Sequence, residues 1–108
     1  MAKEVYVCQT DDIDEEDVRR FDYEGQTYCV YHTPDGFFST DGHCTHEEQH
    51  LEDGIVIDNV IECPLHQGRF DVRSGKALSA PVCVDLKTYP VVIRDGGIHL
   101  CLDTEPSA

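Results

Sequence analysis

Short runs of β-branched and aromatic residues recur along the chain, separated by turn signals such as Asp35-Gly36, Asp41-Gly42 and Asp95-Gly96-Gly97. Because such side chains favour the half-buried surface of a sheet, each run predicts a strand. The predicted strands are Val5–Cys8, Thr27–Tyr31, Gly54–Ile57, Val60–Cys63, Val91–Ile93 and Ile98–Leu102. Many short strands linked by tight turns indicate an antiparallel all-β domain, either a sandwich or a barrel.

The stretch from Asp11 to Arg20 interrupts this pattern. It holds six carboxylates among ten residues, and its apolar side chains are limited to Ile13 and Val18. Because so many charges cannot be buried, the stretch predicts a surface loop or a single helical turn. Residues Thr104–Ala108 predict a frayed tail.

Length and charge narrow the class of protein. The chain has 108 residues, which is typical of one domain. Asp and Glu number 22 against 8 Lys and Arg, so the net charge of −14 disfavours binding to nucleic acid or to an anionic membrane. No signal peptide or membrane span is recognisable in the sequence. We therefore expect a cytoplasmic monomer without nucleic-acid or membrane partners.

Two short segments carry the residues best suited to metal chemistry. Cys44-Thr45-His46 and Cys63-Pro64-Leu65-His66 each offer one thiolate and one imidazole, and 16 residues separate His46 from Cys63. A hairpin over residues 54 to 62 would return the second segment beside the first. Two Cys and two His side chains then converge on one point, which predicts a metal centre.

Cys-x-His, 16 residues and Cys-x-x-His together resemble the Rieske iron–sulfur signature. The chain is similar to the small Rieske-type ferredoxins of multicomponent ring-hydroxylating dioxygenase systems, and the likeness runs from Val5 to Leu102. Beyond the ligand positions it includes Asp41-Gly42, Leu51, Asp53-Gly54, the run from Cys63 to Asp71, Ser74-Gly75-Lys76-Ala77 and Ala80-Pro81.

The resemblance implies one Rieske-type 2Fe-2S cluster, with Cys44 and Cys63 on one iron and His46 and His66 on the other. It also implies a cluster-binding subdomain, about residues 38–80, inserted into a basal β-sandwich or barrel of about residues 1–37 and 81–103. Ala80-Pro81 would form the loop that shields the cluster in this family.

The function implied by the resemblance is one-electron transfer. The carrier would take electrons from a flavin-containing NAD(P)H reductase and pass them to a terminal Rieske non-haem iron oxygenase of bacterial aromatic hydrocarbon catabolism. We expect the chain not to be an enzyme itself, because an oxygenase needs a further 2-His-1-carboxylate iron site. Two alternatives stay open: an iron–sulfur redox sensor, and an interaction module stabilised by a Cys2His2 zinc ion.

The remaining cysteines, Cys8, Cys29, Cys83 and Cys101, predict buried small apolar residues, and a disulfide or a second metal site is the alternative. Of the other histidines, His43 and His50 predict solvated loop residues, whereas His32 and His99 predict ordinary hydrogen bonds within strands.

The acidic excess has two interpretations. It can promote solubility, or it can steer the carrier towards basic patches on its partners. Glu47, Glu48, Glu52 and Asp53 lie in or just after the first ligand segment, which favours steering. Arg69, Arg73 and Lys76 follow the second segment and make the predicted docking face mixed in sign.

Overall fold

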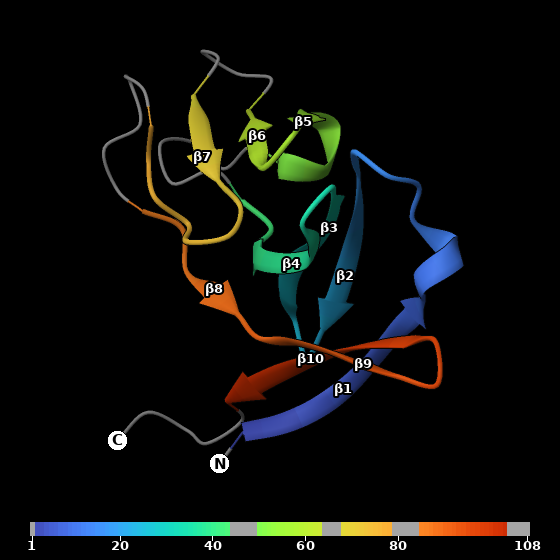
Figure 1. The fold of residues 1–108 in the computed structure, drawn as a ribbon. Helices are drawn as coiled ribbons and strands as arrows, with labels where there is room; N and C mark the ends of the chain where they lie inside the picture. Colours follow the sequence, from blue (N-terminus) through green and yellow to red (C-terminus); the bar gives the residue numbers. More distant parts are fainter. Residues whose placement is uncertain (1, 44–49, 64–67, 79–84, 104–108) are drawn as a thin grey trace.

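The computed structural model describes residues 2–43, 50–63, 68–78 and 85–103, which form three antiparallel sheets (Figure 1). The first has the order β1-β10-β9, from Ala2–Gln9, Gly97–Asp103 and Val91–Arg94. The second, β2-β3-β4-β8, contains Asp17–Tyr23, Gln26–Thr33, Gly36–Asp41 and Thr88–Tyr89. The third, β5-β6-β7, contains Ile55–Ile57, Val60–Glu62 and Arg69–Asp71.

The described residues contain no α-helix, and two short 3-10 turns, η1 (Thr10–Asp12) and η2 (Leu51–Asp53), complete the regular structure. Among the described residues, no helix is long and apolar enough to span a membrane. The predicted all-β antiparallel class is confirmed, and each of the six predicted strands overlaps an observed one. The third sheet falls inside the predicted 38–80 subdomain, whose bounds stay a prediction.

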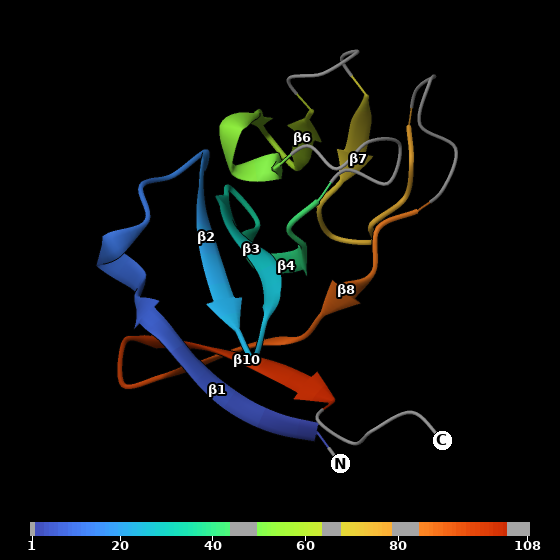
Figure 2. The same cartoon turned by 180° about the vertical axis from the view of Figure 1, so that it is seen from behind.

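Strand β3 lies between two hydrophobic cores and contributes side chains to both. Its buried side chains alternate: Tyr28 and Val30 pack in the core facing the first sheet, whereas Cys29 and Tyr31 pack in the core facing the third sheet. A strand with a period of two, covered on both faces, reads as a continuous run of buried residues. Figures 1 and 2 show the result, with the second sheet lying between the other two.

The prediction for Asp11–Arg20 is only partly correct. Residues Thr10–Asp12 do form a surface turn, but Asp17 to Arg20 belong to strand β2. Strand β2 lies at the edge of its sheet, so its charged side chains face water while Val18 is half-buried against the core. A charged strand at a sheet edge gives little hydrophobic signal, and charge there also opposes unwanted strand pairing.

A polar cluster joins the third sheet to the turn between β3 and β4. Arg73 Nη2 lies 3.0 Å from Asp71 Oδ2, and Arg73 Nη1 lies 3.6 Å from Asp35 Oδ2. The Asn59 side chain donates to the same Asp35 oxygen at 2.7 Å. The Arg73 guanidinium, by hydrogen bonding, holds the pKa of Asp71 below its usual value. This cluster therefore links the third sheet to the second through charge and hydrogen bonds.

We expect Asp71→Asn to lower the free energy of unfolding at neutral pH, because it removes the ion pair with Arg73. The loss should be only roughly 0.5–1 kcal/mol, because the Arg73 side chain is half exposed and water weakens the pair. A carboxyl whose pKa is depressed by folding stabilises the protein above its unfolded pKa, and this contribution is lost as pH falls through the folded pKa. The ordinary pKa of an aspartate carboxyl group such as that of Asp71 is 3.8. The difference from wild type should therefore be constant between about pH 8 and about pH 5.

Urea denaturation across that pH range measures the difference, and Asp14→Asn, at an exposed position outside the cluster, is the control. A difference for Asp71→Asn that disappears on going from pH 8 to pH 5 would contradict the depressed pKa.

Candidate metal centre

The first predicted ligand segment leaves β4 through a glycine that has no room for a side chain. The N–H of Gly42 donates to the carbonyl of Thr27 at 2.9 Å, and a methyl group on Gly42 would lie 2.5 Å from the Thr27 Cγ2 atom. The chain returns where Leu51 N–H donates to the Gly42 carbonyl at 2.9 Å, and His43 and His50 form an antiparallel bridge. These contacts hold together the two ends of the segment.

The second ligand segment begins at Cys63, directly after β6. Cys63 is fully buried, and its N–H donates to the carbonyl of Gly68 at 2.7 Å, which joins the end of β6 to the start of β7. Gly54 packs so closely against β6 that a methyl group on it would lie 2.2 Å from the Glu62 carbonyl oxygen. This close approach brings the chain that follows the first segment against the start of the second.

A third segment is anchored to the same sheet. Leu78 N–H donates to the Arg69 carbonyl at 2.8 Å, and Leu86 N–H donates to the Gly75 carbonyl at 2.7 Å. The residues between these anchors include Ala80-Pro81, which lies outside the described residues. The second and third segments therefore start and end on or beside the third sheet, whereas the first leaves β4 of the second sheet and returns at His50 (Figure 1).

The described part of the site, Cys63, is surrounded by apolar side chains. Cys63 belongs to a core whose other buried members are Cys29, Tyr31, Leu51, Val56, Ile61, Phe70, Val72 and Leu86. A thiolate in such surroundings is costly without a positive partner, and metal coordination supplies one. The burial of Cys63 thus fits a metal ligand.

Cys44, His46 and His66, the other three predicted ligands, lie outside the described residues. Where the structure does describe the chain, it groups no three His, Cys, Asp or Glu side chains into a metal site. The four-residue ligand set is therefore still a prediction.

The prediction that His43 and His50 are solvated loop residues is only partly correct, because both lie outside the strands but are not fully exposed. Both are half-buried, and their ring centroids lie 4.5 Å apart. His50 Nδ1 lies 3.4 Å from Glu52 Oε1, and neither buried atom has a hydrogen-bond partner in the described chain. The other Glu52 oxygen accepts from Arg20 at 3.3 Å, and a hydrogen bond to Asp22 raises the pKa of Arg20. A chain of ionisable groups thus runs from β2 to the base of the first segment.

The other histidines and three of the other cysteines behave largely as predicted. Cys8 and Cys29 are buried, Cys101 is half-buried, and burial raises the pKa of Cys29 to about 12. Cys83 lies outside the described residues. His32 Nδ1 lies 2.9 Å from the Ile13 carbonyl oxygen, and His99 Nδ1 lies 3.3 Å from that of Gly97.

Comparison with known proteins identifies the class. The family described as the Rieske [2Fe-2S] domain matches residues 3–90, so the chain belongs to that family and carries one Rieske-type 2Fe-2S cluster. The resemblance stated from the sequence is thereby confirmed.

The relatives define the member more closely. The ferredoxin component of the 2,4-dinitrotoluene dioxygenase system of Burkholderia sp. (strain RASC) is 46% identical over 84 residues, which cover 78% of this chain and 81% of the relative. That of the naphthalene 1,2-dioxygenase system of Pseudomonas putida is 48% identical over 84 residues, with the same coverage. The chain is thus similar to Rieske-type ferredoxins in particular.

Among solved structures, the complex of reduced oxygenase and oxidized ferredoxin in carbazole 1,9a-dioxygenase contains a chain that superimposes with a TM-score of 0.89. That chain is 30% identical to this one, and the match covers 96% of this chain and 97% of the other. The fold is therefore found in a ferredoxin that has been seen together with an oxygenase.

Proposed function

We propose that this protein is a one-electron carrier that accepts electrons from a flavin-containing NAD(P)H reductase and delivers them to a terminal Rieske non-haem iron oxygenase. The observation that carries the proposal is the similarity, at 46–48% identity, to ferredoxin components of dioxygenase systems. The carrier serves the oxygenase and is not the catalytic component. A cytoplasmic location fits a protein that depends on NAD(P)H.

Cys44 and Cys63 are the proposed ligands of one iron, and His46 and His66 are those of the other. When bound, the cluster supplies a site that gains and loses one electron. Among the proposed ligands, Cys63 lies in the described part of the chain. Its backbone N–H is hydrogen-bonded to the Gly68 carbonyl, and its side chain is buried in an apolar core that excludes water. The second core packs against the other face of β3.

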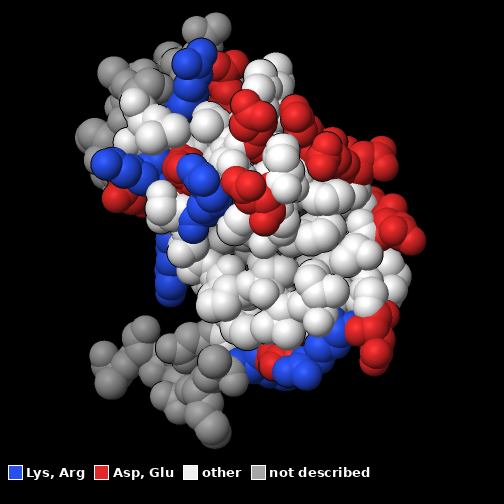
Figure 3. Space-filling model, in the orientation of Figure 1, with Lys and Arg blue, Asp and Glu red and all other residues white. Residues whose placement is uncertain are grey.

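The charge of the chain supports recognition by basic partners. The net charge is −14, and on the face shown in Figure 3 acidic side chains gather mainly along the top and the right-hand edge. A strongly negative carrier is attracted to positive patches on a reductase and an oxygenase, and this attraction raises the rate of encounter. The same charge makes two copies repel each other, which supports a monomer.

Reconstitution tests the proposed function. Purified protein is mixed with a candidate reductase, NADH and a terminal oxygenase, and reduction of the carrier is followed by its visible absorption. We expect reduction by the reductase and reoxidation that depends on the oxygenase and its substrate. A colourless zinc-containing protein would overturn the proposal in favour of the interaction module. A coloured protein that no reductase and oxygenase pair can turn over would favour the sensor.

We expect association with both partners to slow as salt rises, because the Debye length shrinks from about 10 Å at 0.1 M to about 3 Å at 1 M. The double substitution Glu47→Lys and Glu48→Lys, next to proposed ligands but outside the described residues, should slow association more than Asp14→Lys with Glu15→Lys. Stopped-flow rates at several salt concentrations make the measurement. Equal effects from the two pairs would assign the acidic excess to solubility.

A further inference from the structure

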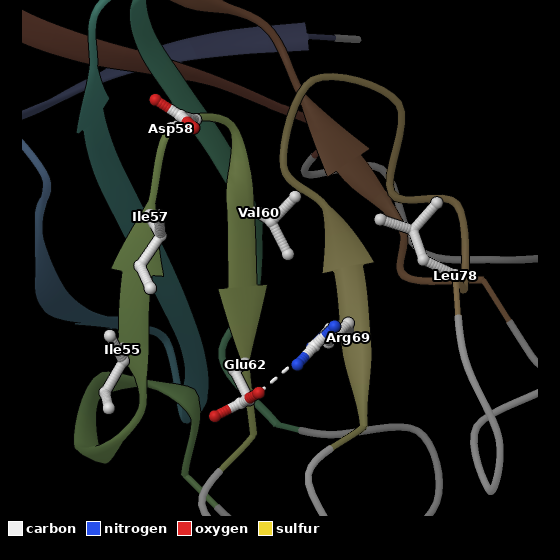
Figure 4. A pocket seen from close by; sticks show the side chains of 7 residues that line it. All are labelled: Ile55, Ile57, Asp58, Val60, Glu62, Arg69 and Leu78. Atoms are coloured by element: carbon white, nitrogen blue, oxygen red, sulfur yellow. Dashed lines mark hydrogen bonds and ion pairs between the residues drawn. The ribbon is translucent and has the colours of Figure 1, made fainter.

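The outer face of the third sheet carries an open apolar groove. Its apolar lining comes from Ile55 and Ile57 on β5, Val60 on β6 and Leu78 after β7, and its volume is about 420 Å³. Figure 4 shows these side chains on one side of the sheet. The groove lies on the opposite side of β5 from Val56, which is buried in the core.

These apolar side chains are unusually exposed for a strand with one buried face. Ile55 is 57% exposed, Ile57 is 59% exposed and Leu78 is 47% exposed. A three-stranded sheet that buries only one face normally alternates apolar residues with polar ones. Strand β5 instead reads Ile-Val-Ile, with apolar residues on both faces. A contiguous exposed apolar surface of this kind is typical of an interaction site.

The charged side chains of the groove favour a basic partner. Arg69 Nε donates to Glu62 Oε1 at 3.0 Å, so this pair neutralises itself across β6 and β7 (Figure 4). Asp58, at the turn between β5 and β6, is exposed and has no ion pair among the described residues. The groove is therefore apolar at its centre and carries one carboxylate without an ion pair in the described chain, that of Asp58, at its rim.

The groove also borders the predicted electron-transfer end of the molecule. Strand β6 leads directly into Cys63, and β7 starts one residue after Gly68, so the strands that line the groove flank the second ligand segment. A partner that reaches the ligand segments would lie beside the groove. A second copy of this chain is a poor occupant, because it brings the same rim carboxylate and a net charge of −14.

We infer that this groove receives an apolar side chain, flanked by Lys or Arg, from the surface of the terminal oxygenase. The inference rests on the proposed function and extends it, since it adds an apolar anchor beside the ligand segments. Burial of an apolar side chain at the centre of an interface supplies affinity, whereas a charged rim supplies orientation and encounter rate.

The test is the double variant Ile55→Thr with Ile57→Thr. Threonine is β-branched like isoleucine and suits a strand, so the fold and the visible spectrum should be retained. The dissociation constant of the cluster-containing protein for the oxygenase, measured by calorimetry, should rise about tenfold, equivalent to ~1.4 kcal/mol. The matched control is Ile93→Thr on β9, an isoleucine 46% exposed on the first sheet, which should leave binding unchanged.

Each outcome decides between occupants. An unchanged dissociation constant in the double variant overturns the inference, and so does a loss confined to reductase binding. Wild-type dimers in sedimentation that disappear in the double variant would assign the groove to a second copy. Failure of the wild type to bind any oxygenase would instead count against the proposed function itself.

Discussion

Replacing Cys63 by Ala is expected to abolish the 2Fe-2S cluster and to destabilise the whole domain. Cys63 is the proposed ligand that the structure does describe, and it is fully buried directly after β6, where its N–H donates to the Gly68 carbonyl. In a domain of 108 residues, binding of a metal centre is coupled to folding, so loss of a ligand removes stability as well as colour. Visible absorption, iron and sulfide content and the thermal unfolding midpoint measure the effect.

Cys29→Ala is the matched control for Cys63→Ala. Cys29 is equally buried and belongs to the same core, but it lies on β3 and outside the predicted ligand set. Its substitution should cost only the packing of a small side chain and leave iron and sulfide content intact. Full cluster content in Cys63→Ala, or equal loss in both variants, would contradict the ligand assignment. Cys44→Ala should behave as Cys63→Ala does.

The predictable part of the fold is the part in which local pattern and burial agree. The run Thr27–Tyr31 predicts a strand because each of its buried side chains contributes to one core or the other. Strand β2 was missed because it lies at a sheet edge, where charged residues face water. Strand β7 is only three residues long and contains Arg69 and Asp71, so its own sequence carries little hydrophobic pattern, and it is recognised as a strand by its pairing with β6.

The candidate site also has a part that could be predicted from the sequence and a part that could not. The spacing of Cys44, His46, Cys63 and His66 could be read from the sequence, because each pair of proposed ligands lies within four consecutive residues. The pairing of His43 with His50 across the base of the first segment, and the approach of His50 to Glu52, was not readable. These contacts depend on how Gly42 and Leu51 close the segment, which no periodicity reveals.

The groove on the third sheet illustrates a further limit. Ile55 and Ile57 correctly predict a strand, but a run of three apolar residues is equally typical of a strand buried on both faces. Only the arrangement of the sheets shows that Val56 points into the core and that its neighbours face outward. The exposure of Ile55 and Ile57, rather than the presence of a strand, is the observation that points to an interaction site.

Gly75→Ala is expected to be among the most destabilising substitutions in the chain. Gly75 has a φ of +77°, and a methyl group on it would lie 2.1 Å from the carbonyl oxygen of Leu86. Gly25 has a similar φ of +80° but nothing within 4 Å of that position. Gly25→Ala should therefore cost only the backbone strain, about 1 kcal/mol, whereas Gly75→Ala adds a backbone clash and should cost roughly 3 kcal/mol or more.

The consequence of Gly75→Ala should extend to the metal centre. The Gly75 carbonyl accepts from Leu86 N–H, and its own N–H donates to the Asp71 carbonyl at 2.7 Å, so the residue anchors the chain on the far side of the third segment. A backbone forced away from Leu86 would loosen that anchor and expose the core around Cys63 to water. Urea denaturation together with the half-life of the visible absorption measures both effects. Equal losses of stability in Gly75→Ala and Gly25→Ala would show that the contact with Leu86 is not needed to hold the segment.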